Sequence, residues 1–234
     1  MNVLVGTSGY SYKEWKGRFY PAGLKEAGML RFYAERFPTV EINNTFYRMP
    51  SPELLARWEG EVPDGFRFIL KAPRRITHEK RLHDVADTVA RLLEVSAGLG
   101  GKRGPFLFQL PPYFKKDAAR LRDFLQLLPR GVRAAFEFRD PSWEDEETAE
   151  TLRAAGAALC LADTDEGAAD PRLVATADWG YLRLRRADYD PGALRAWADR
   201  IRSQPWAEAF VFFKHEDEGR GPELAARLVE ALQA

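Results

Sequence analysis

The 234-residue chain carries 35 basic and 35 acidic residues, which cancel to a formal net charge of zero, and 45% of its residues are hydrophobic. This balance argues against a protein that binds nucleic acid or a membrane surface through overall positive charge. The single cysteine, Cys160, excludes an internal disulfide. Within the apolar sequence AALCLAD it is predicted to be a buried, unreactive thiol.

The N-terminal sequence MNVLVGTSGY has neither the basic segment nor the apolar segment of a signal peptide. No stretch of the chain approaches the roughly 20 apolar residues that a membrane-spanning helix requires. We therefore expect a cytoplasmic protein without a membrane partner.

Short runs rich in aromatic and β-branched residues recur along the whole chain, bounded by Gly, Pro or Asp, as is typical of strands. The predicted strands are residues 3–6, 39–43, 66–71, 105–110, 133–139, 157–163, 180–185 and 209–215. Amphipathic patterns predict helices over residues 84–99, 117–128, 190–203 and 221–234. The first three of these helices begin with Asp84, Asp117 and Asp190, which are placed to cap them.

Eight strand candidates alternating with helices are typical of a (β/α)8 barrel of the TIM type, and we predict a single such domain over residues 1–234. A doubly wound open sheet shares the alternation but usually has fewer strands. No GxGxxG motif follows the first strand, so a dinucleotide is not predicted, and no motif specifies another cofactor. Gly and Pro interrupt residues 160–176, so the helix after the sixth strand is expected to be short or degenerate.

Polar residues collect where the predicted strands end, and the sequence EINNTFYR at 41–48 shows this most clearly. In a barrel of this type alternate residues point inward, and the C-terminal strand ends hold the site. If Val40 and Ile42 pack outward against helices, Glu41 and Asn43 point into the mouth of the barrel.

The same alternation predicts the orientation of the other strands. It turns Cys160 outward and places Asp163 at the tip of its strand, and it assigns Lys214 and His215 to opposite faces. The alternation predicts that seven further side chains point inward: Lys71, Gln109, Glu137, Arg139, Tyr181, Arg183 and Arg185. A purely structural network of ion pairs is the alternative interpretation. Because desolvation costs several kcal/mol per ion, we favour a ligand site.

Cations beside carboxylates suit an anionic substrate, since arginine binds phosphate or carboxylate with two parallel hydrogen bonds and lysine adds a compact charge. Glu137 is the preferred general acid or base, and Lys71 and Asp163 are further catalytic candidates. Backbone amides beside Gly6 and Gly9 are a weaker candidate for binding an oxyanion. The predicted ligand-binding residues are Glu41, Asn43, Gln109, Arg139, Arg183, Arg185, His78 and Tyr12.

The chain resembles the YecE-like family, also called domain of unknown function 72, through several long motifs in the same order. The motifs are GTSGYSYKEWKGRFYP (6–21), VEINNTFYRMPS (40–51), FRFILKAPRRITHEKRL (66–82), FQLPP (108–112), FEFRDPSW (136–143) and YLRL (181–184). The resemblance implies a barrel without an established activity, and a likeness to endonuclease IV and xylose isomerase at the level of fold only.

This chain departs from the family pattern at two strand ends. Where the resemblance implies Arg-x-His-Gly, the chain has Arg185 and Arg186 after Arg183. Where it implies paired Asn, the chain has Lys214 and His215. We therefore expect a more cationic mouth than is typical of the family.

Metal binding and nucleic-acid binding are alternative hypotheses for the function of this mouth. His78 and His83 are five residues apart, unlike a helical zinc pair, and cations surround the predicted carboxylates, so no metal site is predicted. Nucleic acid or another polyanion, with nuclease activity of the endonuclease IV kind, is the alternative function, because the loop at 71–81 is basic and aromatic residues lie near it. The neutral net charge counts against this alternative, so we favour an anionic small molecule.

Overall fold

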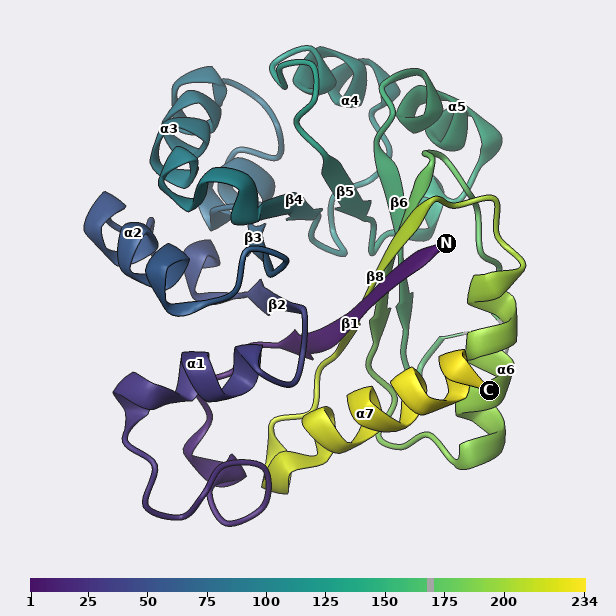
Figure 1. Ribbon diagram of the computed structural model, residues 1–234. Coiled ribbons are helices and arrows are strands. Elements are labelled where there is room, and N and C mark those ends of the chain that lie inside the picture. The colour runs from purple at the N-terminus through teal and green to yellow at the C-terminus, as the bar shows by residue number, and fades with distance from the viewer. Residues whose placement is uncertain (168–170) are drawn as a thin grey trace.

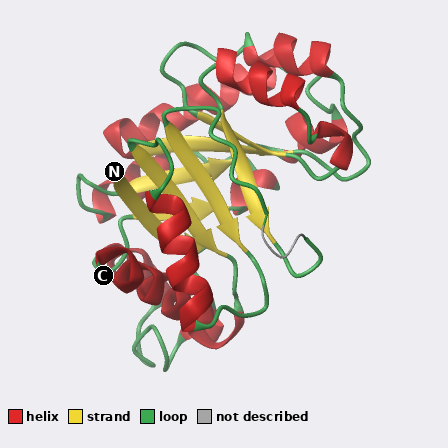
Figure 2. Cartoon of the chain, turned by 90° about the vertical axis from the view of Figure 1, so that its right-hand side faces the viewer, coloured by secondary structure: helices red, strands yellow, loops and turns green. Residues whose placement is uncertain are grey.

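Eight parallel strands form one closed barrel in the computed structural model, which describes residues 1–167 and 171–234. Each strand pairs with the next, and the last pairs with the first, which closes the sheet. The strands are β1 (Asn2–Ser8), β2 (Thr39–Ile42), β3 (Arg67–Lys71), β4 (Arg103–Gln109), β5 (Ala134–Glu137), β6 (Ala158–Asp163), β7 (Trp179–Leu184) and β8 (Glu208–Phe213). Helices surround the strands (Figures 1 and 2). The predicted (β/α)8 barrel is confirmed.

The α-helices of the described residues are α1 (Met29–Ala34), α2 (Pro52–Glu61), α3 (Ala86–Ser96), α4 (Ala118–Leu125), α5 (Glu146–Ala154), α6 (Pro191–Arg202) and α7 (Arg220–Gln233). Between β6 and β7 the described residues contain no helix, as the interruption by Gly and Pro predicted, while residues 168–170 of that segment lie outside the described residues. Across the described chain, no helix combines the length and the apolar character that crossing a bilayer requires.

Two of the three predicted helix caps are confirmed. The Asp117 side chain accepts a hydrogen bond from the Arg120 amide at 3.0 Å, and Asp190 accepts one from Ala193 at 2.8 Å. The prediction for Asp84 is wrong, because α3 begins at Ala86 with Val85 at its N-cap. Asp84 instead has a positive φ of 50° and pairs with His83 at 2.9 Å.

Apolar side chains lie on both sides of the sheet, in two separate clusters. The outer cluster packs the sheet against the helices and includes, from the strands, Val40, Ile42, Phe68, Leu70, Phe106, Phe108, Phe136, Leu182 and Leu184. The inner cluster fills the barrel with Leu4, Ile69, Leu107, Ala135, Ala158, Cys160, Trp179, Tyr181, Phe210 and Phe212. The predicted outward faces of β2, β3, β4, β5 and β7 are thus confirmed.

The predicted orientation of β6 is wrong. Cys160 belongs to the inner cluster, whereas Leu159 and Leu161 pack against the outer one. The reason is physical: both faces of this strand are apolar, so alternation of polarity could not fix which face turns inward. Cys160 is buried and free, and burial raises the pKa of its thiol, as expected of an unreactive side chain.

Gly6 occupies a position where β1 and β2 approach too closely for any side chain. A Cβ atom there would lie 2.1 Å from the carbonyl oxygen of Thr39 and 3.0 Å from the Tyr33 hydroxyl. Gly9, with φ of 96°, has the Tyr12 ring packed where its Cβ would be. Gly6 in β1 and Gly9 in the loop after it therefore have a structural role that does not depend on an oxyanion.

Replacing Gly6 by alanine is expected to lower the free energy of unfolding by about 3 kcal/mol or more, because the added methyl group meets backbone atoms that cannot move aside. Urea denaturation measures this change. Gly65→Ala is the control, since its Cβ would meet no atom within 4 Å, and its effect should stay within about 0.5 kcal/mol. Equal unfolding midpoints for the two variants would contradict the close approach of β1 and β2.

Candidate functional site

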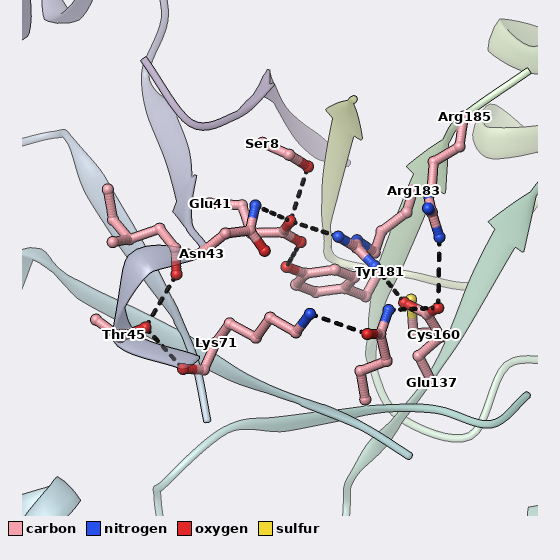
Figure 3. A network of polar contacts seen from close by, with 12 residues as sticks. Ser8, Glu41, Asn43, Thr45, Lys71, Glu137, Cys160, Tyr181, Arg183 and Arg185 are labelled. Carbon is pink, nitrogen blue, oxygen red and sulfur yellow. Dashed lines mark hydrogen bonds and ion pairs between the residues drawn. The ribbon is translucent and has the colours of Figure 1, made fainter. Parts of the chain in front are cut away.

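Two buried carboxylates share one buried guanidinium at the C-terminal end of the barrel (Figure 3). Arg183 donates from Nη1 to Glu137 Oε2 at 2.5 Å and from Nη2 to Glu41 Oε1 at 2.9 Å. The exposed fractions of the three side chains are 2%, 1% and 0%, respectively. The strands β2, β5 and β7 thus place their inward residues in direct contact, as alternation predicted. We call these three residues the floor of the site.

Neighbouring side chains complete the hydrogen bonding of each carboxylate. Glu41 accepts from the Tyr181 hydroxyl at 2.6 Å and from Ser8 Oγ at 2.7 Å, and more weakly from the amide of Asn43 at 3.3 Å. Ser8 can do so because it lies directly beside Glu41 in the pairing of β1 with β2.

Gln109 provides a hydrogen bond to Glu137 in the same way. It is the register partner of Glu137 on β4 and donates its amide to Glu137 Oε1 at 2.7 Å. Arg139 Nε reaches the same oxygen at 3.3 Å, and an Arg185 nitrogen lies 3.9 Å from it.

These contacts keep both carboxylates ionised. Burial alone would raise the pKa of Glu41, but the charge of Arg183 and the hydrogen bond from Tyr181 outweigh it and lower that pKa below its ordinary value. Burial would likewise raise the pKa of Glu137, yet the charges of Arg183 and Arg139 lower it to about 2. Near neutral pH the floor therefore holds two negative charges and one positive charge.

Further cations surround the floor, and we call Lys71, Arg139, Arg185 and Lys214 the rim. The side chains of Lys71, Arg185 and Lys214 are partly buried, whereas Arg139 is exposed. Burial, followed by repulsion from Arg183, lowers the pKa of Lys71 to about 8 and lowers that of Arg185. Burial and the charge of Arg185 lower the pKa of Lys214, although Glu216 partly offsets this. Five cations of floor and rim thus face two carboxylates.

Lys71 differs from the arginines of the site in its partners. Its Nζ donates to Gln109 Oε1 at 2.9 Å and lies 4.3 Å from the centre of the Phe46 ring. Throughout the described residues, no carboxylate oxygen comes within 4.0 Å of this nitrogen. Lys71 is therefore held in place without being paired to a negative charge.

A family model described as "Protein of unknown function DUF72" matches residues 4–234. The chain belongs to the DUF72 family. This confirms the resemblance to YecE-like proteins that the motifs indicated.

Curated DUF72-type relatives match part of the chain. UPF0759 protein YecE of Escherichia coli K12 is 32% identical over 151 residues, which make up 62% of this chain and 53% of that protein. UPF0759 protein YunF of Bacillus subtilis 168 is 27% identical over 150 residues, or 60% of this chain and 52% of YunF. The chain thus spans about half the length of the curated relatives it matches.

Solved DUF72 structures match the whole barrel. The crystal structure of a DUF72 family protein from Thermotoga maritima has a TM-score of 0.83, with 26% identity and 100% of both chains covered. A DUF72 family protein from Enterococcus faecalis has a TM-score of 0.81, covers 99% of this chain and 96% of its own, and at 19% identity shows the shared fold alone.

Asp163 lies outside the floor and rim of this DUF72 barrel. It accepts hydrogen bonds from Arg186 Nε at 2.6 Å and from the Tyr189 hydroxyl at 2.9 Å. Asp163 lies apart from the floor and rim because it points to the same side of β6 as Leu159 and Leu161, which face outward. The structure therefore does not bring this predicted catalytic residue together with Glu137 and Lys71.

Two predicted ligand-binding residues lie in loops beside the site. His78, within the π-helical turn Arg75–Glu79, packs its ring edge-on to Phe46 at 4.9 Å, and burial and the charge of Lys71 lower its pKa to about 4. The Tyr12 hydroxyl donates to the carbonyl oxygen of Ser8 at 2.8 Å, so it supports the loop after β1. His78 is thus a neutral neighbour of the rim, and Tyr12 is bonded to backbone.

Ser8 and Phe46 were missed as site residues. Ser8 lies outside the predicted strand, because β1 extends two residues beyond the predicted end at residue 6, so alternation predicts no orientation for it. Phe46 belongs to the sequence EINNTFYR but is not among the predicted ligand-binding residues, although its face contacts Lys71. Within residues 1–167 and 171–234, no three His, Cys, Asp or Glu side chains are grouped as metal ligands would be.

Proposed function

We propose that the protein binds a small molecule carrying a phosphate or carboxylate group at the C-terminal mouth of the barrel and transforms it by acid–base chemistry. The observation that carries this proposal is the excess of positive charge. Glu41 and Glu137 supply only two negative charges against the five cations of floor and rim. Among the described residues Lys71 and Lys214 form no ion pair with a carboxylate, whereas Arg139 reaches Glu137 at 3.3 Å. An anion bound among the rim cations would relieve their mutual repulsion.

Lys71 is the proton-transfer group that the geometry favours within this proposal. A group transfers protons efficiently when its pKa lies near the working pH. The pKa of Lys71 is lowered to about 8, whereas that of Glu137 is lowered to about 2. Glu137, the residue preferred from sequence, then acts as a fixed carboxylate that orients Lys71 through Gln109.

Replacing Arg185 by glutamine should weaken the binding of inorganic phosphate at least about tenfold, because a hydrogen bond to a charged group contributes about 1.5–3 kcal/mol. Isothermal titration calorimetry measures the dissociation constant. Arg153→Gln is the matched control, since Arg153 pairs with Glu146 on the outer surface of α5 and should leave phosphate binding unchanged. Equal phosphate affinities for wild type and Arg185→Gln would contradict the proposal.

Nucleic acid is a second candidate ligand, supported by two exposed aromatic side chains. Tyr47 follows β2 and Tyr113 follows β4, and they are 78% and 63% exposed. Exposed aromatic rings near cations stack on bases in proteins that bind single strands. Affinity for a single-stranded oligonucleotide should then fall steeply as salt increases. Absence of binding at low salt would remove this candidate.

A further inference from the structure

We infer that the ligand of the mouth is a small anionic carbonyl compound, of the 2-oxo acid class, and that the Lys71 amine forms an imine with its carbonyl carbon. The inference rests on the proposed anion site and adds the class of substrate and a covalent step.

The surroundings of Lys71 Nζ suit a nucleophile better than a structural charge. Lysines that stabilise the fold of this chain form ion pairs with carboxylates. Lys116 pairs with Asp145 and Glu147. Lys102 Nζ lies 2.9 Å from a Glu59 carboxylate oxygen. Such ion pairs hold the amine protonated and unreactive. Lys71 has no such partner among the described residues, and a neutral amide oxygen holds its nitrogen instead.

Gln109 fixes the orientation of that nitrogen. Its amide group donates to Glu137 Oε1 at 2.7 Å, which turns its carbonyl oxygen toward Lys71 at 2.9 Å. An amine that donates a hydrogen bond keeps its lone pair available. The Phe46 ring lies on one side of Nζ, with its centre 4.3 Å away. Burial, which lowers the pKa of Lys71 to about 8, gives a neutral fraction of roughly one tenth at pH 7.

The step balances without an oxidant or a reductant. The nitrogen lone pair attacks the carbonyl carbon, a C–N bond forms, and the π electrons of C=O move to the oxygen, while one of the two amine hydrogens passes to that oxygen as a proton. The C–O bond of this carbinolamine then breaks, and the hydroxyl group leaves with the second amine hydrogen as one water molecule, which gives C=N. The carboxylate of the oxo acid would be bound by the rim arginines Arg139 and Arg185, which lie on the Glu137 side of Gln109.

Reductive trapping tests the inference. The full chain is incubated with pyruvate and sodium cyanoborohydride, and the labelled lysine is mapped by peptide mass spectrometry. We expect one adduct, on Lys71, formed at least about tenfold faster than on exposed lysines, and slowed by inorganic phosphate. Lys71→Arg, which keeps the charge, should lose the adduct, whereas Lys25→Arg, at an exposed position, should retain it. Equal labelling of many lysines, or labelling of Lys214 alone, would overturn the inference.

Acetone, a neutral ketone of similar size, separates this inference from the proposed function. Arg185→Gln should slow trapping by pyruvate but not by acetone. This comparison also tests the inference if the Lys71→Arg variant fails to fold. If phosphate binds in an Arg185-dependent manner but no ketone labels Lys71, the proposed function stands and the imine is refuted. If acetone labels Lys71 as fast as pyruvate does and phosphate gives no protection, the anionic class of substrate is refuted together with the anion site.

Discussion

Replacing Arg183 by methionine is expected to lower the free energy of unfolding by about 3–5 kcal/mol, the typical cost of removing one partner from a buried ion pair. The substitution leaves Glu41 and Glu137 buried without the guanidinium that bridges them at 2.9 and 2.5 Å. The hydrogen bonds from the neutral groups of Tyr181 and Gln109, and the longer one from Arg139 Nε to Glu137 at 3.3 Å, compensate only in part. Urea denaturation at neutral pH measures the loss.

An exposed ion pair provides the control for this experiment. Arg153 lies 3.1 Å from Glu146, with side chains 45% and 67% exposed, and Arg153→Met should cost less than about 1 kcal/mol. A similarly small loss for Arg183→Met would show that the floor contributes little to stability. The loss at Arg183 should also shrink in acid, because the orphaned carboxylates can then bind protons.

Stability should fall as the pH is lowered from about 4.5 toward 2, and Glu137 should account for much of that fall. Its pKa is lowered from the ordinary 4.5 to about 2 in the folded protein. Between these values the unfolded chain binds more protons than the folded one, so acid favours unfolding. The stabilisation is complete above pH 4.5 and is lost as pH approaches 2. It amounts to roughly 3 kcal/mol at about 1.4 kcal/mol per pKa unit.

The Glu137→Gln variant isolates this contribution, since glutamine does not titrate. We expect a lower stability at neutral pH and a shallower decline between pH 5 and 3 than in the wild type, measured by urea denaturation across that range. Glu146→Gln, at an exposed carboxylate, should keep the wild-type slope. Parallel pH profiles for wild type and Glu137→Gln would contradict the lowered pKa of Glu137.

Alternation of polarity predicted the floor because its strands separate polar from apolar residues cleanly. In β2, Glu41 lies between Val40 and Ile42, and in β7, Arg183 lies between two leucines, so only one orientation buries the apolar side. The predicted orientation is wrong for β6, because Cys160 and its neighbours are apolar on both faces. There the choice depends on the volume available inside the barrel, which no single strand specifies.

The contacts within the site could not be predicted from one strand at a time. Ser8 meets Glu41, and Gln109 meets Glu137, because the register of neighbouring strands aligns them. Register depends on strand ends, and the predicted end of β1 was two residues too short. The low pKa of Lys71 likewise follows from burial and from the charge of Arg183, which lies far from it in sequence.

The packed interior of the barrel has a kinetic consequence. Beneath the floor, the inner cluster of Trp179, Phe210, Phe212 and their neighbours leaves these side chains almost fully buried, so the barrel is no channel. A ligand bound at the mouth, as we propose, would therefore enter and leave on the C-terminal side of the floor. For a reaction with one substrate and one product, product should therefore act as a competitive inhibitor, raising the apparent KM while leaving the maximal velocity unchanged.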